Sequence, residues 1–411
     1  MPRILIAVTH LLGSGHLVRA RHLARALAGA GHEVTLASGG MPLAARQDEP
    51  FAFVQLPPVK VEGVDFRNLL DEAGQPIATE RRAMRQAMLS DLAMSLRPDV
   101  VITEHFPFGR RQLAGEFMGL IAAAKAVNPR VLVLSSIRDV LVAPRTERIY
   151  EAEQRIISHF DGVLVHGDAA FLPLEASWPA SPELTGRLHY TGYLAEPSLR
   201  APGSCLRQAR VQAQRSNPGG VEQDAGLLRC ARNDEEAEII VSGGGSAAAM
   251  PLFELCLAAA GLLGPVRGWR ILVGRGVSEA AFAGLRDSAP AHVTVEWARP
   301  DFPALLAGCA LSISQAGYNT VLDLVAAGRP AIVVPFDAGN ETEQAIRAQA
   351  MERAGLARCL RLDGDIPLTP IFLVQAVESM LNDAPKRSVT IDRSGGDAVC
   401  DIVARLLGAR S

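Results

Sequence analysis

Residues 4–16 read ILIAVTHLLGSGH, and this stretch decides how the first half of the chain folds. Residues 4–8 form a short apolar run, which is typical of a strand buried on both faces of a parallel sheet. A glycine-containing loop follows, and residues 17–30 then repeat apolar side chains with helical spacing. Gly31 is suited to ending that helix, and residues 34–37 predict the next strand.

The same alternation of strand and helix continues along the chain and then begins again. In the first half, further strands are predicted at residues 100–103, 131–134 and 163–165. In the second half, strands are predicted at residues 239–242, 270–273, 293–296, 311–313 and 331–334. Strands that alternate with helices indicate βαβ units and a mostly parallel sheet. The expected fold class is α/β, with two Rossmann-like, doubly wound domains that face a cleft.

Shifts in composition divide the chain into four parts. We expect an N-terminal domain over residues 1–195, a linker with an irregular insertion over 196–236, and a second domain over 237–390. Within the linker, residues 211–234 are polar and have no clear period, which fits an irregular excursion or an ordinary linker equally well. Residues 391–411 predict an amphipathic helix. Its apolar face is formed by Val399, Ile402, Val403, Leu406 and Leu407.

Bulk properties exclude several classes of protein. The chain has 411 residues, a formal net charge of -3 and 5% aromatic residues, so it offers neither a basic field nor a stacking platform for nucleic acid. The six cysteines include no CxxC pair, which argues against a zinc site and favours a reducing compartment. No run approaches the roughly 20 apolar residues of a membrane span. We expect a cytoplasmic protein, and peripheral contact with the inner membrane face is an open alternative.

The loop Gly13-Ser14-Gly15-His16 follows the first strand and opens a helix. Gly13 and Gly15 allow a ligand to approach the backbone, and a helix N-terminus favours anions. A dinucleotide site is not expected, because Val18 stands at the third glycine position and no acidic residue ends the second strand. His16 lies at the carboxyl edge of the sheet, and a histidine's ordinary pKa of about 6.5 suits a general base. A tight turn with an ordinary polar histidine is the competing interpretation.

A second glycine loop, Ser242-Gly243-Gly244-Gly245-Ser246, follows the first strand of the second domain. Successive glycines present backbone N–H groups to a phosphate, so Gly244, Gly245 and Ser246 are candidate phosphate ligands. No Gly-Lys-Ser/Thr follows, which excludes a Walker A loop. A flexible loop is the alternative, and the order of strand, glycines and helix favours phosphate binding.

The most specific stretch is residues 312–344, SISQAGYNTVLDLVAAGRPAIVVPFDAGNETEQ. Small and donor groups at a helix N-terminus suit a phosphate, an acid one turn later suits ribose hydroxyls, and an acid–amide pair suits sugar hydroxyls. These groups are, in order, Gly317, Asn319, Thr320, Asp323, Glu343 and Gln344. Each alone is more typical of a helix cap, a helix-face acid or a solvated charged run, whereas the ordered set over 33 residues indicates a binding site.

This stretch resembles the donor-sugar signature of GT-B glycosyltransferases, above all the family 28 C-terminal domain, and it is similar to that of plant secondary-metabolite glucosyltransferases. The resemblance implies a nucleotide diphosphate-sugar donor, with UDP as the expected nucleotide, and a last helix that crosses back to the first domain. It implies that the diphosphate binds Gly317, Asn319 and Thr320, the ribose binds Asp323, and the sugar binds Glu343 and Gln344. It also implies that Gly244, Gly245 and Ser246 form the second phosphate loop.

Two positions depart from the family pattern. Gln315 stands where the plant enzymes have histidine and the bacterial family has arginine, so this donor-side position brings less charge to the diphosphate. Arg275 is a candidate to supply that charge instead. Asp323 is one methylene shorter than the usual glutamate.

The N-terminal half carries weaker resemblances. The loop containing Gly13 and Gly15 resembles the acceptor loop of family 28, and residues 15–19, GHLVR, also resemble the loop of a nucleotide-sugar hydrolase. Residues 98–111 and 136–140 are similar to bacterial predicted glycosyltransferases of unassigned substrate.

The resemblance implies sugar transfer to a hydroxyl acceptor with inversion at the anomeric carbon. No metal or other cofactor is expected, because helix N-termini and loop amides can offset the charge of the leaving diphosphate. The candidate bases are His16, Glu104 and Asp139; the last two follow strands, and loop hydrogen bonding is their alternative role. The competing functions are a nucleotide-sugar hydrolase or epimerase of the same fold, the hydrolase with water activated by His16, and a catalytically decayed binding protein. The residues do not identify the acceptor.

Overall fold

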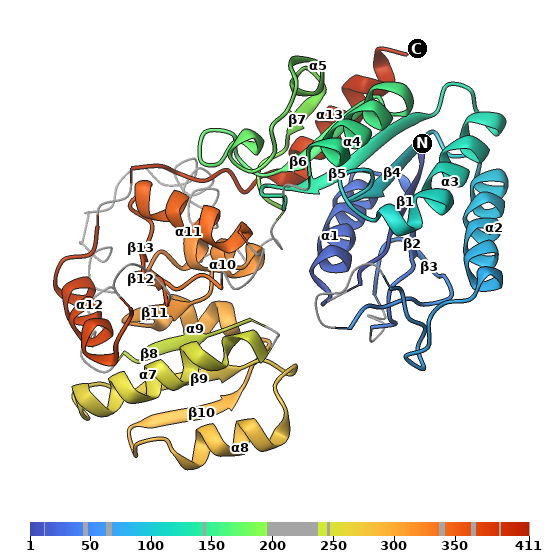
Figure 1. Cartoon of the computed structure of the whole chain (residues 1–411). Helices are drawn as coiled ribbons and strands as arrows, with labels where there is room; N and C mark the ends of the chain where they lie inside the picture. The colour runs from blue at the N-terminus through green and yellow to red at the C-terminus, as the bar shows by residue number, and fades with distance from the viewer. Residues whose placement is uncertain are drawn as a thin grey trace, which may run out of the picture.

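Two α/β domains make up the chain, each built on a parallel sheet (Figure 1). The computed structural model describes residues 1–11, 13–43, 48–62, 68–142, 145–194, 237–244, 247–336, 342–362, 367–385 and 388–410. The predicted excursion at residues 211–234 and the loop residues Gly245 and Ser246 lie outside this described part. The α/β fold class with two doubly wound domains is confirmed.

The described strands of the N-terminal domain form a sheet in the order β3-β2-β1-β4-β5-β6-β7, with every neighbouring pair parallel. The strands are β1 (Arg3–Val8), β2 (Glu33–Ser38), β3 (Ala52–Gln55), β4 (Val100–Glu104), β5 (Leu132–Arg138), β6 (Gly162–His166) and β7 (Leu188–Tyr190). The helices are α1 (Gly15–Gly29), α2 (Thr79–Leu96), α3 (Ala114–Val127), α4 (Thr146–His159) and α5 (Pro182–Thr185), with short 3-10 turns η1 (Arg111–Leu113) and η2 (Leu174–Ala176).

Successive side chains of each central strand enter opposite faces of this sheet, and both faces are buried. Along β1, Leu5 and Ala7 belong to the apolar cluster with α2, α3 and α4. Ile4, Ile6 and Val8 belong to the cluster with α1 and α13 (Gly395–Gly408). Burial on both faces explains why this strand has no polar alternation in the sequence.

The second domain repeats this plan. Its described strands are parallel in the order β10-β9-β8-β11-β12-β13. They are β8 (Ile239–Ser242), β9 (Trp269–Val273), β10 (Val293–Trp297), β11 (Leu311–Ser314), β12 (Ala331–Val333) and β13 (Arg358–Cys359). Helices α7 (Met250–Leu263), α8 (Glu279–Asp287) and α12 (Pro370–Asn382) cover one face; α9 (Phe302–Gly308), α10 (Tyr318–Ala327) and α11 (Glu343–Arg353) cover the other, and the turn η3 (Ala247–Ala249) precedes α7.

Each sheet has a point at which the strand order reverses, between β1 and β4 in the first sheet and between β8 and β11 in the second. Helices from the two adjacent strands leave toward opposite faces at such a point, so their loops separate and leave a crevice at the carboxyl edge. The loop of His16 follows β1, and the loop of Gly317 follows β11. Both therefore open at the position where this fold class binds ligands.

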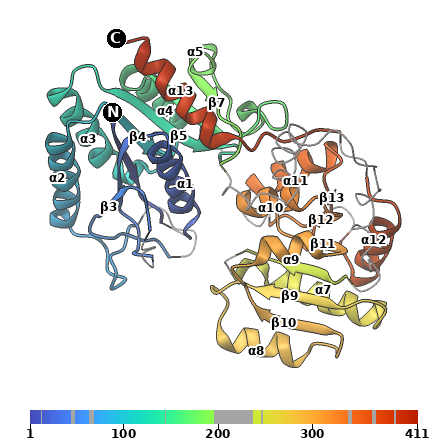
Figure 2. The same ribbon diagram turned by 180° about the vertical axis from the view of Figure 1, so that it is seen from behind.

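The last helix, α13, packs on the N-terminal domain, as both views show for the red C-terminal helix (Figures 1 and 2). Val399, Ile402 and Val403 are buried against the face that also holds α1. Where the chain crosses back, Leu194 pairs with Ser394. No helix in the described ranges is both long and apolar enough to cross a lipid bilayer.

The docking of α13 predicts a measurable cost when its apolar face is truncated. Ile402→Ala removes a side chain that is 8% exposed, and we expect it to lower the free energy of unfolding by about 2 kcal/mol. The exposed neighbour provides the control, because Asp401→Ala should change it by less than about 0.5 kcal/mol. Urea unfolding followed by circular dichroism measures both, and equal effects would contradict the docking.

Candidate active site

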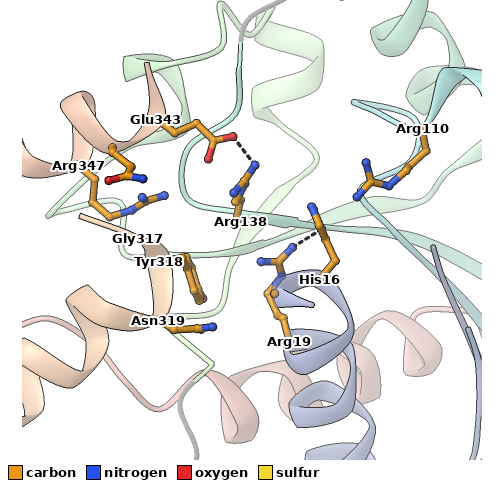
Figure 3. Close-up of a pocket in the computed structure, with 11 residues that line it drawn as sticks. His16, Arg19, Arg110, Arg138, Gly317, Tyr318, Asn319, Glu343 and Arg347 are labelled. Atoms are coloured by element: carbon orange, nitrogen blue, oxygen red, sulfur yellow. Dashed lines mark hydrogen bonds and ion pairs between the residues drawn. The ribbon is translucent and has the colours of Figure 1, made fainter. Parts of the chain in front are cut away.

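A cavity of about 300 Å³ lies between the two domains (Figure 3). Both domains contribute to it, from the carboxyl edges of their sheets and from the first turns of α1, α10 and α11. The lining residues are Gly15, His16, Arg19, Arg110, Arg138, Gly317, Tyr318, Asn319, Glu343, Gln344 and Arg347. Arginine is the most frequent residue of this wall, which suits an anionic ligand.

A histidine–glutamate pair lies on the N-terminal side of the cavity. His16 is in the first turn of α1, and Glu104 ends β4, the strand beside β1, so the reversal of strand order brings them together. The His16 Nδ1 atom lies 3.0 Å from Glu104 Oε1. Glu104 is 1% exposed, accepts a hydrogen bond from Ser136 Oγ at 2.6 Å and forms an ion pair with Arg19.

The imidazole of His16 is neutral in this setting. Its burial, followed by the positive charges of Arg110, Arg19 and Arg138, lowers its pKa well below 6.5. Two groups contact Nδ1, the Glu104 carboxylate and Arg19 Nη2 at 3.1 Å; because Arg19 also donates to Glu104, we assign the Nδ1 proton to the carboxylate contact. The Nε2 lone pair is then available to accept a proton, which is the state that a general base requires.

Asp139 and Arg347 form a buried ion pair between the two domains. Arg347 donates to the Asp139 carboxylate from Nε at 3.0 Å and from Nη2 at 2.9 Å, and it also donates to Ala316 O at 2.8 Å. Tyr193 OH donates to the same carboxylate at 2.8 Å. Arg347 holds the pKa of Asp139 below its usual value although burial acts to raise it.

These contacts change the roles expected for two of the candidate bases. Asp139 and Glu104 are buried, do not line the cavity, and are already bound by cations and hydroxyl groups. Neither carboxylate is placed to meet a ligand in the cavity. The geometry therefore favours positioning roles for both, and it leaves His16 as the cavity-lining base among the three.

The C-terminal side of the cavity is built around the N-terminus of α10. Gly317 occupies the N-cap, and the first helical hydrogen bond runs from Val321 N to Gly317 O at 3.0 Å. The earlier N–H groups of the helix therefore have no partner within it and favour a negative charge. Tyr318 adds an aromatic ring that lies 5.5 Å from the Arg19 guanidinium, and its hydroxyl donates to His166 O at 3.1 Å.

Two side chains at the start of α11 complete this wall. Glu343 forms an ion pair with Arg138 of the other domain (Figure 3). Gln344 Oε1 accepts hydrogen bonds from Ala316 N and Phe336 N, both at 3.1 Å. Gln344 thereby joins the loops that follow β11 and β12.

Only part of the predicted site lines the cavity. Of the predicted residues, the cavity is lined by Gly15, His16, Gly317, Asn319, Glu343 and Gln344. The lining does not include Gly13, Glu104, Asp139, Gly244, Gln315, Thr320 or Asp323. Gln315 instead donates from Nε2 to Ala248 O at 3.3 Å, across the reversal point of the second sheet.

The source of positive charge differs from the one suggested by the sequence. Arg275 lies 4.8 Å from the centre of the Trp297 ring and does not line the cavity. The charge comes from residues that sequence reasoning did not place in the site: Arg19, Arg110, Arg138 and Arg347. A helical-spacing signal existed for two of them, because Arg19 follows His16 by three positions and Arg347 follows Glu343 by four.

In the described part of the chain, no group of three or more His, Cys, Asp or Glu side chains is arranged to hold a metal ion.

Both halves of the chain match known domain families. Residues 14–183 match the glycosyl transferase 4-like domain, and residues 238–406 match the glycosyltransferase family 28 C-terminal domain. The resemblance stated from residues 312–344 is confirmed.

Relatives in sequence are enzymes named UDP-N-acetylglucosamine–N-acetylmuramyl-(pentapeptide) pyrophosphoryl-undecaprenol N-acetylglucosamine transferase. The one from Rhodopseudomonas palustris (strain BisB18) is 31% identical over 179 residues, which cover 41% of this chain and 47% of the relative. The one from Solibacter usitatus (strain Ellin6076) is 44% identical over 61 residues, which cover 15% of this chain and 17% of the relative. The chain thus matches less than half the length of these relatives.

Solved structures with a similar fold cover nearly the whole chain. MurG of Acinetobacter baumannii has a TM-score of 0.59 at 18% identity, and the match covers 98% of this chain and 100% of MurG. The glycosyltransferase VinC, solved in complex with dTDP, has a TM-score of 0.57 at 17% identity, with 99% of both chains covered. At these identities the likeness shows a shared fold.

The buried interdomain ion pair predicts a large effect when one partner is removed. Arg347→Met leaves the Asp139 carboxylate buried without its cation, and we expect a loss of about 3–5 kcal/mol in the free energy of unfolding. Arg353→Met is the matched control, because Arg353 is exposed on the same helix. Urea unfolding of these two variants, of Asp139→Asn and of the double variant Asp139→Asn/Arg347→Met measures the effect, and the single losses to compare are those of Arg347→Met and Asp139→Asn. The double variant should lose less than the two single losses added together.

The acid dependence of stability provides a second readout of this pair. The pKa of Asp139 is lowered in the folded state, so its contribution is present above the ordinary value of 3.8 and is lost as pH falls through the lowered pKa. Arg347→Met should reduce this acid-range dependence. An unchanged dependence would contradict the role given to the pair.

Proposed function

We propose that this chain, which has the GT-B fold of glycosyltransferases, transfers a sugar from a nucleotide diphosphate-sugar to a hydroxyl acceptor. One observation carries the proposal: a cation-rich cavity between the domains joins the N-terminus of α10 to the His16–Glu104 pair. An anion site beside a neutral histidine supplies the two requirements of this reaction, stabilisation of a leaving diphosphate and removal of a hydroxyl proton.

The donor diphosphate is placed at the N-terminus of α10. Gly317 and Asn319 offer backbone and side-chain donors there, Arg347 brings positive charge from the same domain, and Arg138 brings it from the other domain, beside Glu343. These groups can offset the charge that develops on the leaving diphosphate, so we propose a reaction that does not require a metal ion. Glu343 and Gln344 lie in the same wall, where they can face the hydroxyl groups of the sugar.

His16 is proposed as the base. The acceptor oxygen forms a bond to the anomeric carbon as the bond from that carbon to the diphosphate oxygen breaks, and the hydroxyl proton passes to His16 Nε2. Glu104 holds the ring by its Nδ1 contact and stabilises the imidazolium that results. Because the base and the anion site come from opposite walls, attack occurs on the face away from the diphosphate and inverts the anomeric carbon.

The expected donor is a UDP-sugar. The sequence relatives are named for UDP-N-acetylglucosamine, which makes it the first donor to test. A thermal-shift comparison of UDP-sugars and dTDP-sugars tests the donor site, because a ligand that binds the folded state stabilises it according to its concentration and Kd. If no nucleotide or nucleotide sugar stabilises the chain, the proposal fails.

Replacement of the base predicts a loss of turnover without a loss of donor binding. We expect His16→Ala to reduce kcat/KM by about 100- to 10,000-fold, because general base catalysis contributes that much. The thermal shift with UDP should persist, since His16 is not among the residues proposed to bind the diphosphate. UDP release in the presence of UDP-N-acetylglucosamine and candidate acceptors measures turnover.

The control for this variant is His159→Ala, at the end of α4 and outside the cavity lining, which should keep full activity. Unchanged turnover in His16→Ala would exclude His16 as the general base. Rapid UDP release without any acceptor, lost in His16→Ala, would instead identify a nucleotide-sugar hydrolase.

The setting of His16 predicts where activity falls on the acid side. A base must be unprotonated, and the pKa of His16 lies well below 6.5 in the free protein, so the acid limb of kcat/KM should lie below pH 6.5. A bound diphosphate adds negative charge to the cavity and raises this pKa. The acid limb of kcat should therefore lie at higher pH than that of kcat/KM. Steady-state rates across pH measure both, and coincident limbs would contradict this electrostatic coupling.

A further inference from the structure

The loop after β4 is built to hold Arg110 in a fixed place. His105 and Arg110 both adopt left-handed backbone conformations, with φ of 65° and 60°, which cost energy for residues other than glycine. The loop is closed by a hydrogen bond from Gly109 N to His105 O at 2.7 Å. A Cβ atom at Gly109 would lie 2.4 Å from His105 Cδ2, so a larger residue would not fit.

Hydrogen bonds to the middle of the loop hold it to the sheet. The carbonyl oxygen of Phe106 accepts hydrogen bonds from Thr103 Oγ1 and Ser135 Oγ, both at 2.8 Å. The Phe106 ring stacks on Phe117 with centroids 4.9 Å apart. Arg110 is thus presented to the cavity from a rigid support, which is typical of a binding residue.

Arg110 differs from the other arginines of the cavity in having no anionic partner among the described residues. Arg19 pairs with Glu104, Arg138 with Glu343 and Arg347 with Asp139. Over the ranges that the structure describes, the Arg110 side chain makes no hydrogen bond or ion pair, and its Nε atom is buried. A shielded guanidinium without a partner is unfavourable, and a bidentate oxyanion would relieve it.

The guanidinium remains charged despite this environment. Burial, partly offset by Glu104, lowers the pKa of Arg110 to about 10, with Arg138 and Arg19 adding to the effect. At neutral pH the group is therefore still protonated and able to bind an anion.

The position of Arg110 relates it to the acceptor rather than to the donor. Figure 3 shows Arg110 at one end of the cavity and Gly317, Asn319 and Glu343 at the other, with His16 and Arg19 between them. In the proposed reaction the sugar lies between the diphosphate and the base, and the acceptor hydroxyl lies at the base. A group beyond the base therefore contacts the remainder of the acceptor.

We propose that Arg110 binds an oxyanion of the acceptor, so that the acceptor is a hydroxyl compound carrying a phosphate or carboxylate group. This inference rests on the proposed function, whose base and donor wall define the acceptor side. Arg110 then determines specificity, because a neutral acceptor would leave its shielded guanidinium without an anion to bind.

The experiment measures whether a second anion site exists beside the donor. With the chain saturated with UDP, inorganic phosphate and acetate are titrated by calorimetry, as probes for the two acceptor groups. We expect at least one of them to bind together with UDP. Arg110→Gln should weaken that binding by about ten- to a hundred-fold, the value of a charge-assisted hydrogen-bonded pair, and leave the Kd for UDP within about threefold.

Matched variants separate this site from the donor site. Arg111→Gln, at the exposed neighbouring position, should bind both ligands as the native chain does. Arg138→Gln should weaken the binding of UDP and leave the binding of the second anion unchanged. Thermal unfolding midpoints of all variants report whether each one folds. If Arg110→Gln folds poorly, Arg110→Lys provides the second test. It keeps the positive charge without the bidentate geometry of the guanidinium, so it should bind the anion more weakly than the native chain but still measurably.

Three outcomes would overturn the inference. These are displacement of the probe by UDP, loss of UDP affinity in Arg110→Gln, and failure of both anions to bind the UDP-saturated native chain. A chain that does not bind UDP at all would defeat the proposed function instead. In that case, anion binding that Arg110→Gln removes would still identify the Arg110 site, without assigning it to an acceptor.

Discussion

The bidentate ion pair between Asp139 and Arg347 determines how the two walls of the cavity face each other. Both partners are buried, and their attraction must exceed the cost of removing two charges from water. The other hydrogen bonds to this carboxylate and guanidinium, from Tyr193 and to Ala316, make that exchange favourable. Arg138 precedes Asp139 in the chain, and Glu343 lies one helical turn before Arg347. These two residues form a second ion pair, which lines the cavity itself.

The need to pair each buried charge also explains the roles of the acidic residues. Glu104, Asp139 and Glu343 each neutralise one arginine of the interdomain region. Glu104 and Asp139 looked like bases in the sequence because they follow strands, but both are bound by buried arginines and neither lines the cavity, so neither is placed to accept a proton from a ligand there. The neutral His16 is left as the group able to do so, and Arg110 is left as the cation that needs an anion from outside the described chain.

Most of the fold could be predicted because central parallel strands are apolar throughout. Every predicted strand is present, with ends that differ by a few residues. The strands that were not predicted are β3, β7 and β13, which lie at or beside the sheet edges and are short and partly exposed. Edge strands bury one face poorly, so the apolar pattern that identified β1 and β11 is weak in them.

The candidate site was predicted only in part. Glycine loops, the N-terminus of α10 and the acid–amide pair of α11 are local patterns, and the sequence by itself determined them together with the fold class. Which side chains share a cavity depends on the strand order of two sheets and on the angle between two domains. Only the tertiary structure could therefore decide that Arg275 stacks on Trp297, that Asp139 holds the domains together and that Arg110 has no partner within the described ranges. The physical reason is that a charge is paired or unpaired according to its neighbours in space, and those neighbours are up to about two hundred positions away in the chain, as in the 208-residue separation of Asp139 and Arg347.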